Sequence, residues 1–585
     1  MKSPLGAIEG STQAQAQETK TAPHPVLAAS SPRPASASGS LVPMSQAAIA
    51  GIGGAIGCQV ILLSIAGWHN RHVIVIADAV SYIRIASYYL NGQFGLAVSG
   101  YWGPLFSWLM APWLALVHSP LDAARIAMGV SAVVFLLGSV SILRGLQLPP
   151  AGLMLGTWIT AMASVSWSVE HITPDLLLSG LMALAISHMM RPQWPQSRPM
   201  QFTAGMLWGT AYLAKSVAFV LAFGVGGSLA GLWMISRRSR PKIVLHSLGM
   251  TLLGFLLVAA PWVMTLSWKY QGFTFSTNAK INHAIAGPHG KPGAHPQGFY
   301  IPEPGRIWWW EDPPPNLYQD LYWSPLESLA YAKHQVKVMY KNAKIVVNTL
   351  SGFDALHVGL VTAVFGLLVH LPWRANMAAE RWRWAGVPIV GIAGIYLPVY
   401  ATSQRYYVPT YAFLIAASLG MAAWLTRHPY NRTKWPRLIG FSLITLSFAY
   451  PLVGTLPRAL KGLEDPAATY AYDLAKRLQA AGLYGAIAGT GCYRNPWEGE
   501  PVEPYVALFT NQRYYDCEPN PTAERLKGSR AKLVIVDRRL PLTATLEQDP
   551  AFKNLDHVLF TSKEEADTYP LKVYQLELVE GNQLG

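Results

Sequence analysis

The chain has 585 residues, of which 51% are hydrophobic and only 13% are charged. Soluble globular domains are about one-quarter charged, so this composition excludes an ordinary soluble protein and indicates a membrane protein. The net charge of +14 does not indicate nucleic-acid binding, because Lys and Arg cluster in short loops between apolar runs and no nucleic-acid-binding motif accompanies them.

Residues 1–45 are rich in Ala, Ser, Gln and Pro and carry almost no large apolar side chains. Such a segment cannot bury a hydrophobic core, so we predict a disordered tail on the cytoplasmic side. The first apolar run follows without the layout of a cleaved signal peptide. We therefore interpret this run as the first membrane-spanning helix.

Eleven apolar runs approach the length of about 20 residues that a helix needs to cross a bilayer. They are residues 47–66, 122–143, 151–169, 173–190, 200–214, 217–236, 243–266, 355–372, 385–400, 407–425 and 437–456. Four basic clusters lie between them, at residues 191–198, 237–242, 374–383 and 427–437. Because positively charged loops stay on the cytoplasmic side, this pattern predicts about 11 transmembrane helices with all four clusters inside.

One further apolar run, residues 101–118, is not counted as a span. Counting it would place the first basic cluster outside and invert every later loop. Its aromatic residues and two prolines are typical of a bent segment at the membrane surface, so we expect residues 67–121 to form one long outer loop. Residues 267–350 form a second long outer loop in this topology, and residues 46–456 make up the transmembrane module.

Residues 457–585 follow the last predicted span and face outward. A helical pattern over residues 466–481 precedes three short apolar runs, at 484–489, 505–510 and 531–537, that we predict to be strands. The segment is expected to form a small α/β domain outside the cytoplasm. Its glycines do not complete a nucleotide-binding fingerprint, so a docking or shape-providing role is the favoured interpretation.

The chain has three cysteines. Cys58 falls within the first predicted span and is expected to be a small buried apolar residue. Cys492 and Cys517 both fall in the outward domain, where an oxidising compartment would allow them to pair; two buried thiols are the alternative. No Cys/His spacing indicates structural zinc.

Ionisable residues collect at the predicted outer ends of the helices. Asp78 precedes a helix-like run in the first outer loop, and Asp175 follows His171 in the next one. Each acid could instead serve only its own helix, Asp78 as an N-cap and Asp175 as a first-turn acid. Lys215 lies in an apolar run, where an ionisable residue indicates function unless its side chain reaches the interface. Arg405 lies at another outer helix end.

Two acids and two cations on one side of a membrane predict chemistry on a lipid phosphate. Lys215 and Arg405, with Tyr406 beside it, could hold the phosphate, since Arg offers a planar fork of hydrogen-bond donors. One acid could act as general base toward an acceptor hydroxyl, and the same cations would stabilise the departing phosphate. Trp309, in the tryptophan run of the second outer loop, could stack on a sugar, although interface anchoring is the favoured interpretation.

Four segments carry a resemblance to a known family. "ADAVSYIRIASYYLNGQFGLAVSGYWGPLFSWLMAP", "TPDLLLSGLMALA", "GTAYLAKSVAF" and "SQRYYVPTYAFL" together resemble the GT-C fold membrane glycosyltransferases, in the protein-mannosyltransferase-like and aminoarabinose-transferase-like branch. The resemblance spans roughly residues 47–425. Each motif is weak alone, but their order along the chain is specific.

The resemblance implies polyprenyl-phosphate sugars as donors and action on the periplasmic or lumenal side. It implies that Asp78 is the catalytic acid of the first outer loop and that Asp175 is a second acidic position. It places Tyr101, Trp102 and His171 in the loops where donor and acceptor meet. Many relatives have an acidic pair at the first position, whereas Asp78 is followed by Ala79; Mg²⁺ or Mn²⁺ could still bridge Asp78 and Asp175.

The sequence thus predicts an α-helical polytopic membrane protein of GT-C type with a small C-terminal α/β domain outside the cytoplasm. The expected activity is sugar transfer from a polyprenyl-phosphate donor to a periplasmic or lipid-linked acceptor of the cell envelope (a glycan, lipid or protein), in a bacterial inner membrane. A lipid-linked-sugar flippase without catalytic activity is the alternative, but a transporter should place its ionisable groups near the bilayer midplane. A scaffold that recruits cell-wall partners would leave Lys215 unexplained.

Overall fold

The structure is a computed structural model. It describes residues 44–74, 76–117, 119–236, 239–289, 295–352, 377–399, 403–425, 435–490 and 502–577. The chain divides into two units, Met1–Ser40 and Leu41–Gly585, and every described residue lies in the second. The predicted tail at residues 1–45 therefore lies almost entirely outside the described residues.

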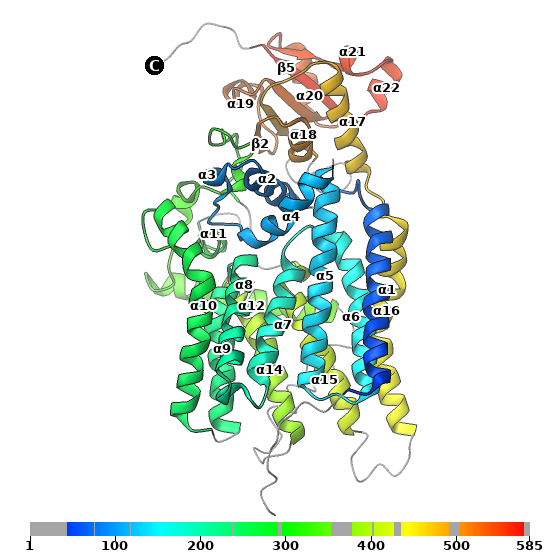
Figure 1. The fold of residues 1–585 in the computed structure, drawn as a ribbon. Helices are drawn as coiled ribbons and strands as arrows, with labels where there is room; N and C mark the ends of the chain where they lie inside the picture. Colours follow the sequence, from blue (N-terminus) through cyan, green and yellow to red (C-terminus); the bar gives the residue numbers. More distant parts are fainter. Residues whose placement is uncertain are drawn as a thin grey trace, which may run out of the picture. The chain divides into compact units, whose positions relative to one another are not determined.

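Among the described residues, ten long helices form a bundle in which neighbouring helices run side by side (Figure 1). They are α1 (Gln46–His69), α5 (Pro120–Gly145), α6 (Pro150–Glu170), α7 (Asp175–Met190), α8 (Arg198–Ala214), α9 (Val217–Ser236), α10 (Pro241–Lys269), α14 (Met377–Ile395), α15 (Val408–Leu425) and α16 (Trp435–Lys461). Each overlaps a predicted apolar run, although α14 begins eight residues before its run. The remaining predicted run, residues 355–372, lies outside the described residues.

Proline marks the start of several of these helices. Pro120, Pro150 and Pro241 lie in the first turn of α5, α6 and α10, where the missing N–H has no helical partner to lose and the fixed φ suits a helix. Within the described residues, four helices are long and apolar enough to cross a membrane by length and composition: α1, α5, α9 (over Val217–Ile235) and α10. That the shorter helices also cross it stays a prediction.

The run at 101–118 contains α4 (Pro104–Leu116), with Pro112 inside it. At about 1.5 Å per residue, 13 residues cover only about two-thirds of a hydrocarbon core. The prediction that this run does not span the membrane is therefore consistent with its length. Helix α4 packs on α2 (Asp78–Leu90), and both fall with α3 (Phe94–Ala97) within residues 67–121, the predicted first outer loop.

Glycine allows a close helix contact between α8 and α10. A Cβ built on Gly205 would lie 1.9 Å from the carbonyl oxygen of Thr251, and one on Gly254 would lie 2.2 Å from the carbonyl oxygen of Phe202. Neither position can carry a side chain without moving a backbone.

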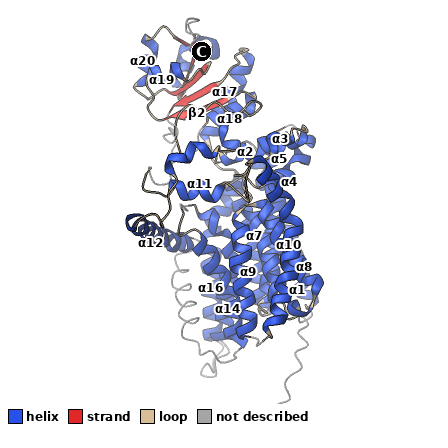
Figure 2. Cartoon of the chain, turned by 90° about the vertical axis from the view of Figure 1, so that its left-hand side faces the viewer, coloured by secondary structure: helices blue, strands red, loops and turns tan. Residues whose placement is uncertain are grey.

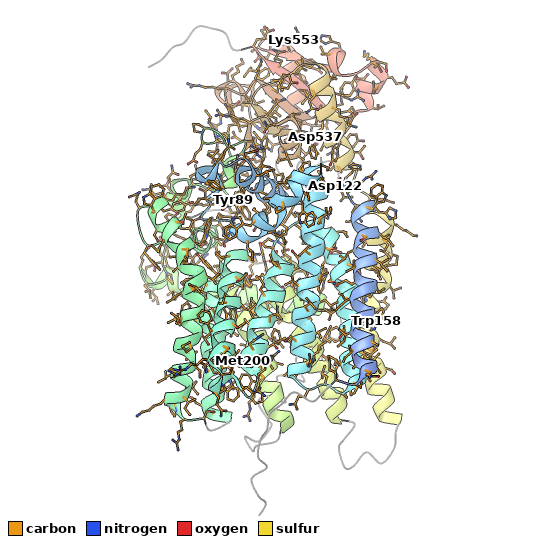
Figure 3. All side chains as sticks on the ribbon, in the orientation of Figure 1. Tyr89, Asp122, Trp158, Met200, Asp537 and Lys553 are labelled. Carbon is orange, nitrogen blue, oxygen red and sulfur yellow. The ribbon has the colours of Figure 1, made fainter. Side chains whose placement is uncertain are left out.

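Asp122 near the start of α5 and Met200 near the start of α8 lie at opposite ends of the bundle (Figure 3).

The second outer loop carries short elements and one long helix. They are α11 (Asn278–Ile285), η2 (Trp309–Glu311), η3 (Pro315–Leu321) and α12 (Leu329–Gly352). Two more 3₁₀ helices connect bundle helices: η1 (Trp194–Gln196) before α8 and η4 (Gln404–Tyr407) before α15. Helix α12 lies across the direction of the bundle helices (Figure 2).

The C-terminal segment forms a domain of small helices around a five-stranded sheet. Its elements are α17 (Pro466–Ala480), β1 (Ile487–Thr490), α18 (Glu503–Thr510), β2 (Tyr514–Glu518), α19 (Ala523–Gly528), β3 (Leu533–Asp537), α20 (Leu542–Gln548), β4 (Phe552–Asn554), α21 (Asp556–Leu559), α22 (Lys563–Thr568) and β5 (Leu571–Leu576). The strand order is β2-β1-β3-β5-β4. Strands β1, β2 and β3 are parallel, and β5 is antiparallel to both β3 and β4.

The prediction of a strand at residues 505–510 is wrong, because these residues belong to helix α18. Pro504 lies in its first turn beside Glu503, both ordinary signals of a helix start. The run is buried on nearly every side, so its hydrophobic pattern shows neither a strand nor a helix period. The predicted helix at 466–481 and the predicted strands around 487 and 533 are confirmed.

The second outer loop lines the edge of this sheet. Tyr514 N–H donates to the carbonyl of Ile307 at 2.7 Å, and Tyr300 N–H donates to the carbonyl of Tyr515 at 2.8 Å. Strand β2 is the edge strand on this side, so these bonds occupy backbone groups that would otherwise lack a partner. In addition, Tyr505 of α18 donates its hydroxyl to the carbonyl of Ile76, just before α2.

The described cysteines differ in their bonding state. Cys58 is a free thiol, half-buried rather than fully buried as we expected. Cys517 of β2 is disulfide-bonded. Cys492 lies outside the described residues, so its pairing with Cys517 stays a prediction.

Candidate active site

Four ionisable residues predicted from the sequence come together where helices of the bundle begin and end. Asp78 is the first residue of α2 and Asp175 the first of α7. Lys215 directly follows the last residue of α8, and Arg405 lies in η4 just before α15. The site therefore draws on both ends of the sequence of the transmembrane module, and four different connections meet there.

Asp78 uses its carboxylate for tertiary contacts and not as a helix cap. The N-cap of α2 is Ala77, which makes no side-chain capping bond. Asp78 Oδ2 instead accepts a hydrogen bond from Arg405 Nη2 at 2.8 Å, and Oδ1 accepts one from Trp310 Nε1 at 3.3 Å. The simple capping interpretation of Asp78 is thus excluded.

Asp175 is held more completely. Its Oδ1 lies 2.6 Å from Lys215 Nζ, and its Oδ2 accepts a hydrogen bond from Thr173 Oγ1 at 2.8 Å. The residue is only 3% exposed. Leaving this buried carboxylate without its cation would cost several kcal/mol, so the pair fixes both side chains.

The backbone around Lys215 is shaped by a close approach. Residue 215 leaves the helix with extended φ and ψ of −154° and 129°, which ends α8. A Cβ on Gly103 would lie 2.5 Å from the carbonyl oxygens of Leu213 and Ala214. Only glycine at 103 lets the first outer loop contact this helix end, so that loop and Lys215 belong to one site.

Tyr406 connects the two ion pairs. Its ring centroid lies 4.6 Å from Lys215 Nζ and 5.1 Å from Arg405 Cζ, and the ring stacks on Tyr396. Cations are attracted to the face of an aromatic ring. Within the described part of the chain, Arg405 Nε is buried and has no hydrogen-bond partner.

An aromatic wall borders the Asp78 side. Tyr101, Trp102 and Trp310 pack with ring centroids 4.6 to 5.7 Å apart. Trp102 Nε1 and Ser81 Oγ both donate to the carbonyl of Trp310, at 2.7 and 3.1 Å. Two residues predicted from the sequence, Tyr101 and Trp102, thus lie in the site.

Trp309 lies elsewhere. Its Nε1 donates to Asp516 Oδ2 of strand β2 at 2.5 Å, whereas its neighbour Trp310 contacts Asp78. The sequence singled out Trp309 from the run of three, but neighbouring side chains of an irregular segment point in different directions. Nothing in the run itself tells which tryptophan meets the carboxylate.

Two histidines lie beside the site. His171 follows α6, and its Nδ1 contacts the carbonyl of Glu170; burial, with the nearby Arg405, lowers its pKa below the usual value. His295 pairs its Nδ1 with the hydroxyl of Tyr318 at 2.9 Å and packs its ring 4.5 Å from Trp310. Burial lowers the pKa of His295 to about 4, so both rings are neutral at pH 7.

Sequence reasoning missed the acids that hold the tryptophan segment in place. Glu311 is fully buried, accepts from the N–H groups of Ile307 and Trp308 at 3.1 Å, and accepts from the hydroxyl of Tyr88 at 2.7 Å. Burial raises the pKa of Glu311 above its usual value. The signal was present in "WWWEDPPP", where two acids follow a bulky apolar run.

Asp312 makes the second anchor of this segment. Its Oδ2 lies 2.5 Å from Lys269 Nζ at the end of α10. Its Oδ1 accepts from the hydroxyl of Tyr270 at 2.7 Å and from Gly100 N–H at 3.1 Å. The segment with Trp310 is therefore tied to the bundle and to the first outer loop on both sides of the site.

A divalent cation that bridges Asp78 and Asp175 stays a prediction. Both carboxylates already face a cationic side chain, and the described residues contain no group of three or more His, Cys, Asp and Glu side chains that could hold a metal ion. Mg²⁺ and Mn²⁺ prefer several oxygen ligands with uncompensated charge.

The chain matches no family model and no curated protein. It does match solved structures. ArnT from Cupriavidus metallidurans bound to undecaprenyl phosphate is 13% identical, with a TM-score of 0.52 over 90% of this chain and 97% of that chain. AglB from Archaeoglobus fulgidus is an archaeal oligosaccharyltransferase, solved in complex with an inhibitory peptide and a dolichol-phosphate. It is 11% identical, with a TM-score of 0.51 over 84% of this chain and 69% of that chain. These proteins share the GT-C fold, so the predicted GT-C fold is confirmed.

Proposed function

We propose that the chain is an integral membrane glycosyltransferase that moves a sugar from a polyprenyl-phosphate donor to an acceptor outside the cytoplasm. The observation that carries the proposal is the double ion pair, Asp78 with Arg405 and Asp175 with Lys215, joined by Tyr406. The fold adds support, because ArnT binds undecaprenyl phosphate and AglB a dolichol-phosphate in their solved structures.

The donor phosphate would bind where the two cations converge. Lys215 and Arg405 reach Tyr406 from two different connections, and Arg405 Nε still lacks a partner among the described residues. An incoming phosphate offers several strong acceptor oxygens. It would compete with Asp78 for Arg405, so donor binding would free Asp78 at the moment when a base is needed.

Asp78 is the general base of the proposed reaction. Its side chain keeps 19% of its surface exposed, against 5% for Asp175, so an acceptor can reach it. The acceptor hydroxyl transfers its proton to Asp78 as its oxygen bonds to the anomeric carbon. The bond from that carbon to the phosphate oxygen breaks, and the electron pair leaves with the lipid phosphate.

Lys215 and Arg405 favour the transition state over the bound donor. A sugar phosphodiester carries one negative charge, and the departing lipid phosphate gains a second as the bond breaks. Fixed cations next to that oxygen are worth more as its charge grows. Asp175 and Thr173 hold Lys215 at this position, which makes Asp175 a positioning residue.

Tyr101, Trp102 and Trp310 are proposed to contact the sugar beside Asp78. Aromatic rings present flat apolar faces with polar edges, which suits the faces of a sugar ring. The acceptor is expected to be a periplasmic or lipid-linked component of the cell envelope. In this proposal the N-terminus is cytoplasmic and the C-terminal domain periplasmic, so a reporter fused after Gly585 should be active only outside the cytoplasm.

The test is sugar transfer by the purified protein in liposomes, with a panel of radiolabelled polyprenyl-phosphate sugars and isolated cell envelopes as acceptor. Transfer by the wild type that is absent from Asp78→Asn supports the proposal. Asp320→Asn, an exposed acid of the second outer loop, is the matched control and should keep full activity. Treatment with EDTA followed by added Mg²⁺ or Mn²⁺ tests metal dependence separately.

The flippase remains the second candidate, and the same liposomes distinguish it. A flippase would carry the labelled lipid to the other leaflet without forming a glycosylated product. Labelled lipid that crosses the bilayer intact, with no product from any donor, would overturn the enzymatic proposal.

A further inference from the structure

Helix α12 (Leu329–Gly352) has no part in the proposed chemistry, yet its surface is strongly patterned. It belongs to the second outer loop and lies across the direction of the bundle helices (Figure 2). At 3.6 residues per turn, its side chains fall into three faces. One faces the protein, one is exposed and apolar, and one is exposed and basic.

The protein-facing side holds the connection that leads to the candidate site. Gln335 Nε2 donates to the carbonyl of Pro398 at 3.1 Å. Asn342 Nδ2 donates to the carbonyl of Leu397 at 2.8 Å and also to that of Val399. Both side chains are buried, and α12 also contacts η4, which carries Arg405. The helix is thus fixed to the bundle at the outer ends of its helices.

The apolar face has no partner among the described residues. Leu329, Val336, Tyr340 and Val347 are spaced by seven, four and seven residues, so they form one stripe along the helix. Their exposed fractions are 73%, 66%, 63% and 51%. A stripe of this kind is unfavourable in water, and its position beside the bundle makes a lipid bilayer the available apolar phase.

The basic face runs along the edge of this apolar stripe. Lys333, Lys337, Lys341 and Lys344 are all exposed, and α12 contains no acidic residue. None of the four lysines forms an ion pair with any residue that the structure describes, although Lys344 Nζ lies 4.6 Å from the ring centroid of Tyr340. Four lysines without an ion-pair partner beside an apolar stripe are complementary to a membrane surface, where anionic headgroups border apolar acyl chains.

We propose that α12 is a docking surface for anionic phospholipids. The apolar stripe enters the boundary between headgroups and acyl chains, and the lysine stripe contacts the lipid phosphates. Amphipathic helices with basic polar faces bind anionic membranes in this way. The proposal does not depend on the glycosyltransferase activity, because it concerns a surface away from the two ion pairs.

The test measures amide hydrogen exchange of α12 in the full-length protein. The protein is placed in nanodiscs of phosphatidylcholine alone, or with one-third phosphatidylglycerol, without any polyprenyl phosphate. We expect exchange in α12 to be at least about tenfold slower with the anionic lipid, and the difference to shrink in 0.5 M NaCl because salt screens the lysines. Equal exchange in the two lipids would overturn the proposal.

Variants separate charge from apolar insertion. Lys333→Gln, Lys337→Gln, Lys341→Gln and Lys344→Gln combined should abolish the effect of phosphatidylglycerol and keep the rate seen in phosphatidylcholine. The control combines Lys476→Gln, Lys553→Gln and Lys563→Gln, which are exposed lysines of the C-terminal domain, and it should keep the full effect. Lys553 lies on the far side of that domain from the bundle (Figure 3).

Two further outcomes count against the proposal. If the fourfold variant still responds to phosphatidylglycerol, the lysines do not carry the recognition. If inorganic phosphate added to phosphatidylcholine discs slows exchange as well as phosphatidylglycerol does, the surface binds free anions and not lipid. If the fourfold variant does not fold, the wild-type comparison between the two lipids and the salt series still decide.

Discussion

Asp78 and Asp175 each begin a helix and each pair with a cation, yet their surroundings differ. Asp175 is buried, and both of its carboxylate oxygens are engaged by neighbours within 2.8 Å. Asp78 is more exposed, and its second contact, with Trp310, is a longer 3.3 Å. A tightly held carboxylate positions its partner, whereas a loosely held one can exchange its partner for a substrate. The same residue type thus serves two different purposes at one site.

The largest effect is expected from Asp78→Asn. Asparagine keeps the shape and the contact with Trp310 but cannot accept a proton as a base, so kcat should fall about 10³-fold with little change in the KM for the donor. Steady-state kinetics in liposomes measure this. Wild-type kcat in the variant would remove Asp78 from the proposed mechanism.

Arg405 and Lys215 come next. Arg405→Gln and Lys215→Gln should each lower kcat about 10²-fold, because each removes a cation beside the departing phosphate. Arg405→Lys should lose less, since it keeps the charge and gives up only the forked geometry. Binding of polyprenyl phosphate by the purified variants checks the cause, and unchanged binding in both Gln variants would contradict the assignment.

Asp175→Asn should have a different signature from Asp78→Asn. The change leaves Lys215 without its charged partner, so we expect a higher KM for the donor, a loss in kcat of about tenfold, and unfolding easier by about 1–3 kcal/mol. A denaturation series on the same protein gives the stability. If Asp175→Asn reproduced the kinetics of Asp78→Asn with no loss of stability, the distinction between the two acids would be wrong.

The two neighbouring tryptophans sharpen the comparison. Trp310→Phe removes the hydrogen bond to Asp78 and should lower kcat by about tenfold. Trp309→Phe removes only the bond to Asp516 and should change kcat less than about threefold. Equal losses in the two variants would mean that the C-terminal domain supports Asp78 as strongly as the direct contact does.

The smallest expected effect is a pH dependence of stability in the C-terminal domain. Burial raises the pKa of Glu503 to about 7 and that of Asp516 to about 7, above the values of about 4 for unfolded chains. Between pH 4 and 7 the folded domain therefore binds more protons than the unfolded chain. Its stability should fall as the pH rises through this window and level off above it.

Asp516→Asn tests this dependence, because asparagine tolerates the positive φ of 72° at this position. The difference in Tm between pH 5 and pH 8 should shrink by about 2–4 °C relative to the wild type. The pH profile of sugar transfer should keep its shape, since Asp516 contacts neither ion pair. A changed profile would tie this acid to the chemistry.

Much of the helix bundle could be predicted from the sequence, because long apolar runs have few alternatives to a helix in a membrane. Asp78, Asp175, Lys215 and Arg405 could also be selected, since ionisable groups stand out among apolar neighbours and the topology put them on one side. The secondary structure of short apolar runs was harder to predict. Residues 505–510 are buried on nearly every side, so their hydrophobic pattern shows neither a helix nor a strand period.

The contacts of the tryptophan segment could not be predicted from the sequence. That Trp310 and not Trp309 contacts Asp78 depends on anchors far away in the sequence. Glu311 is fixed by Tyr88, and Asp312 by Lys269 and Tyr270. Such pairings over more than 40 residues leave no periodic signal. They follow only from the path of the folded chain.

The backbone bonds between the second outer loop and strand β2 bear on how the chain must be produced. Residues 300 and 307 shield the edge of the sheet, and an exposed strand edge can pair with a second molecule. The C-terminal domain expressed alone should therefore self-associate. A chain truncated before α17 would in turn leave the segment of Trp310 without its outer support. The two parts are best regarded as one unit for biogenesis.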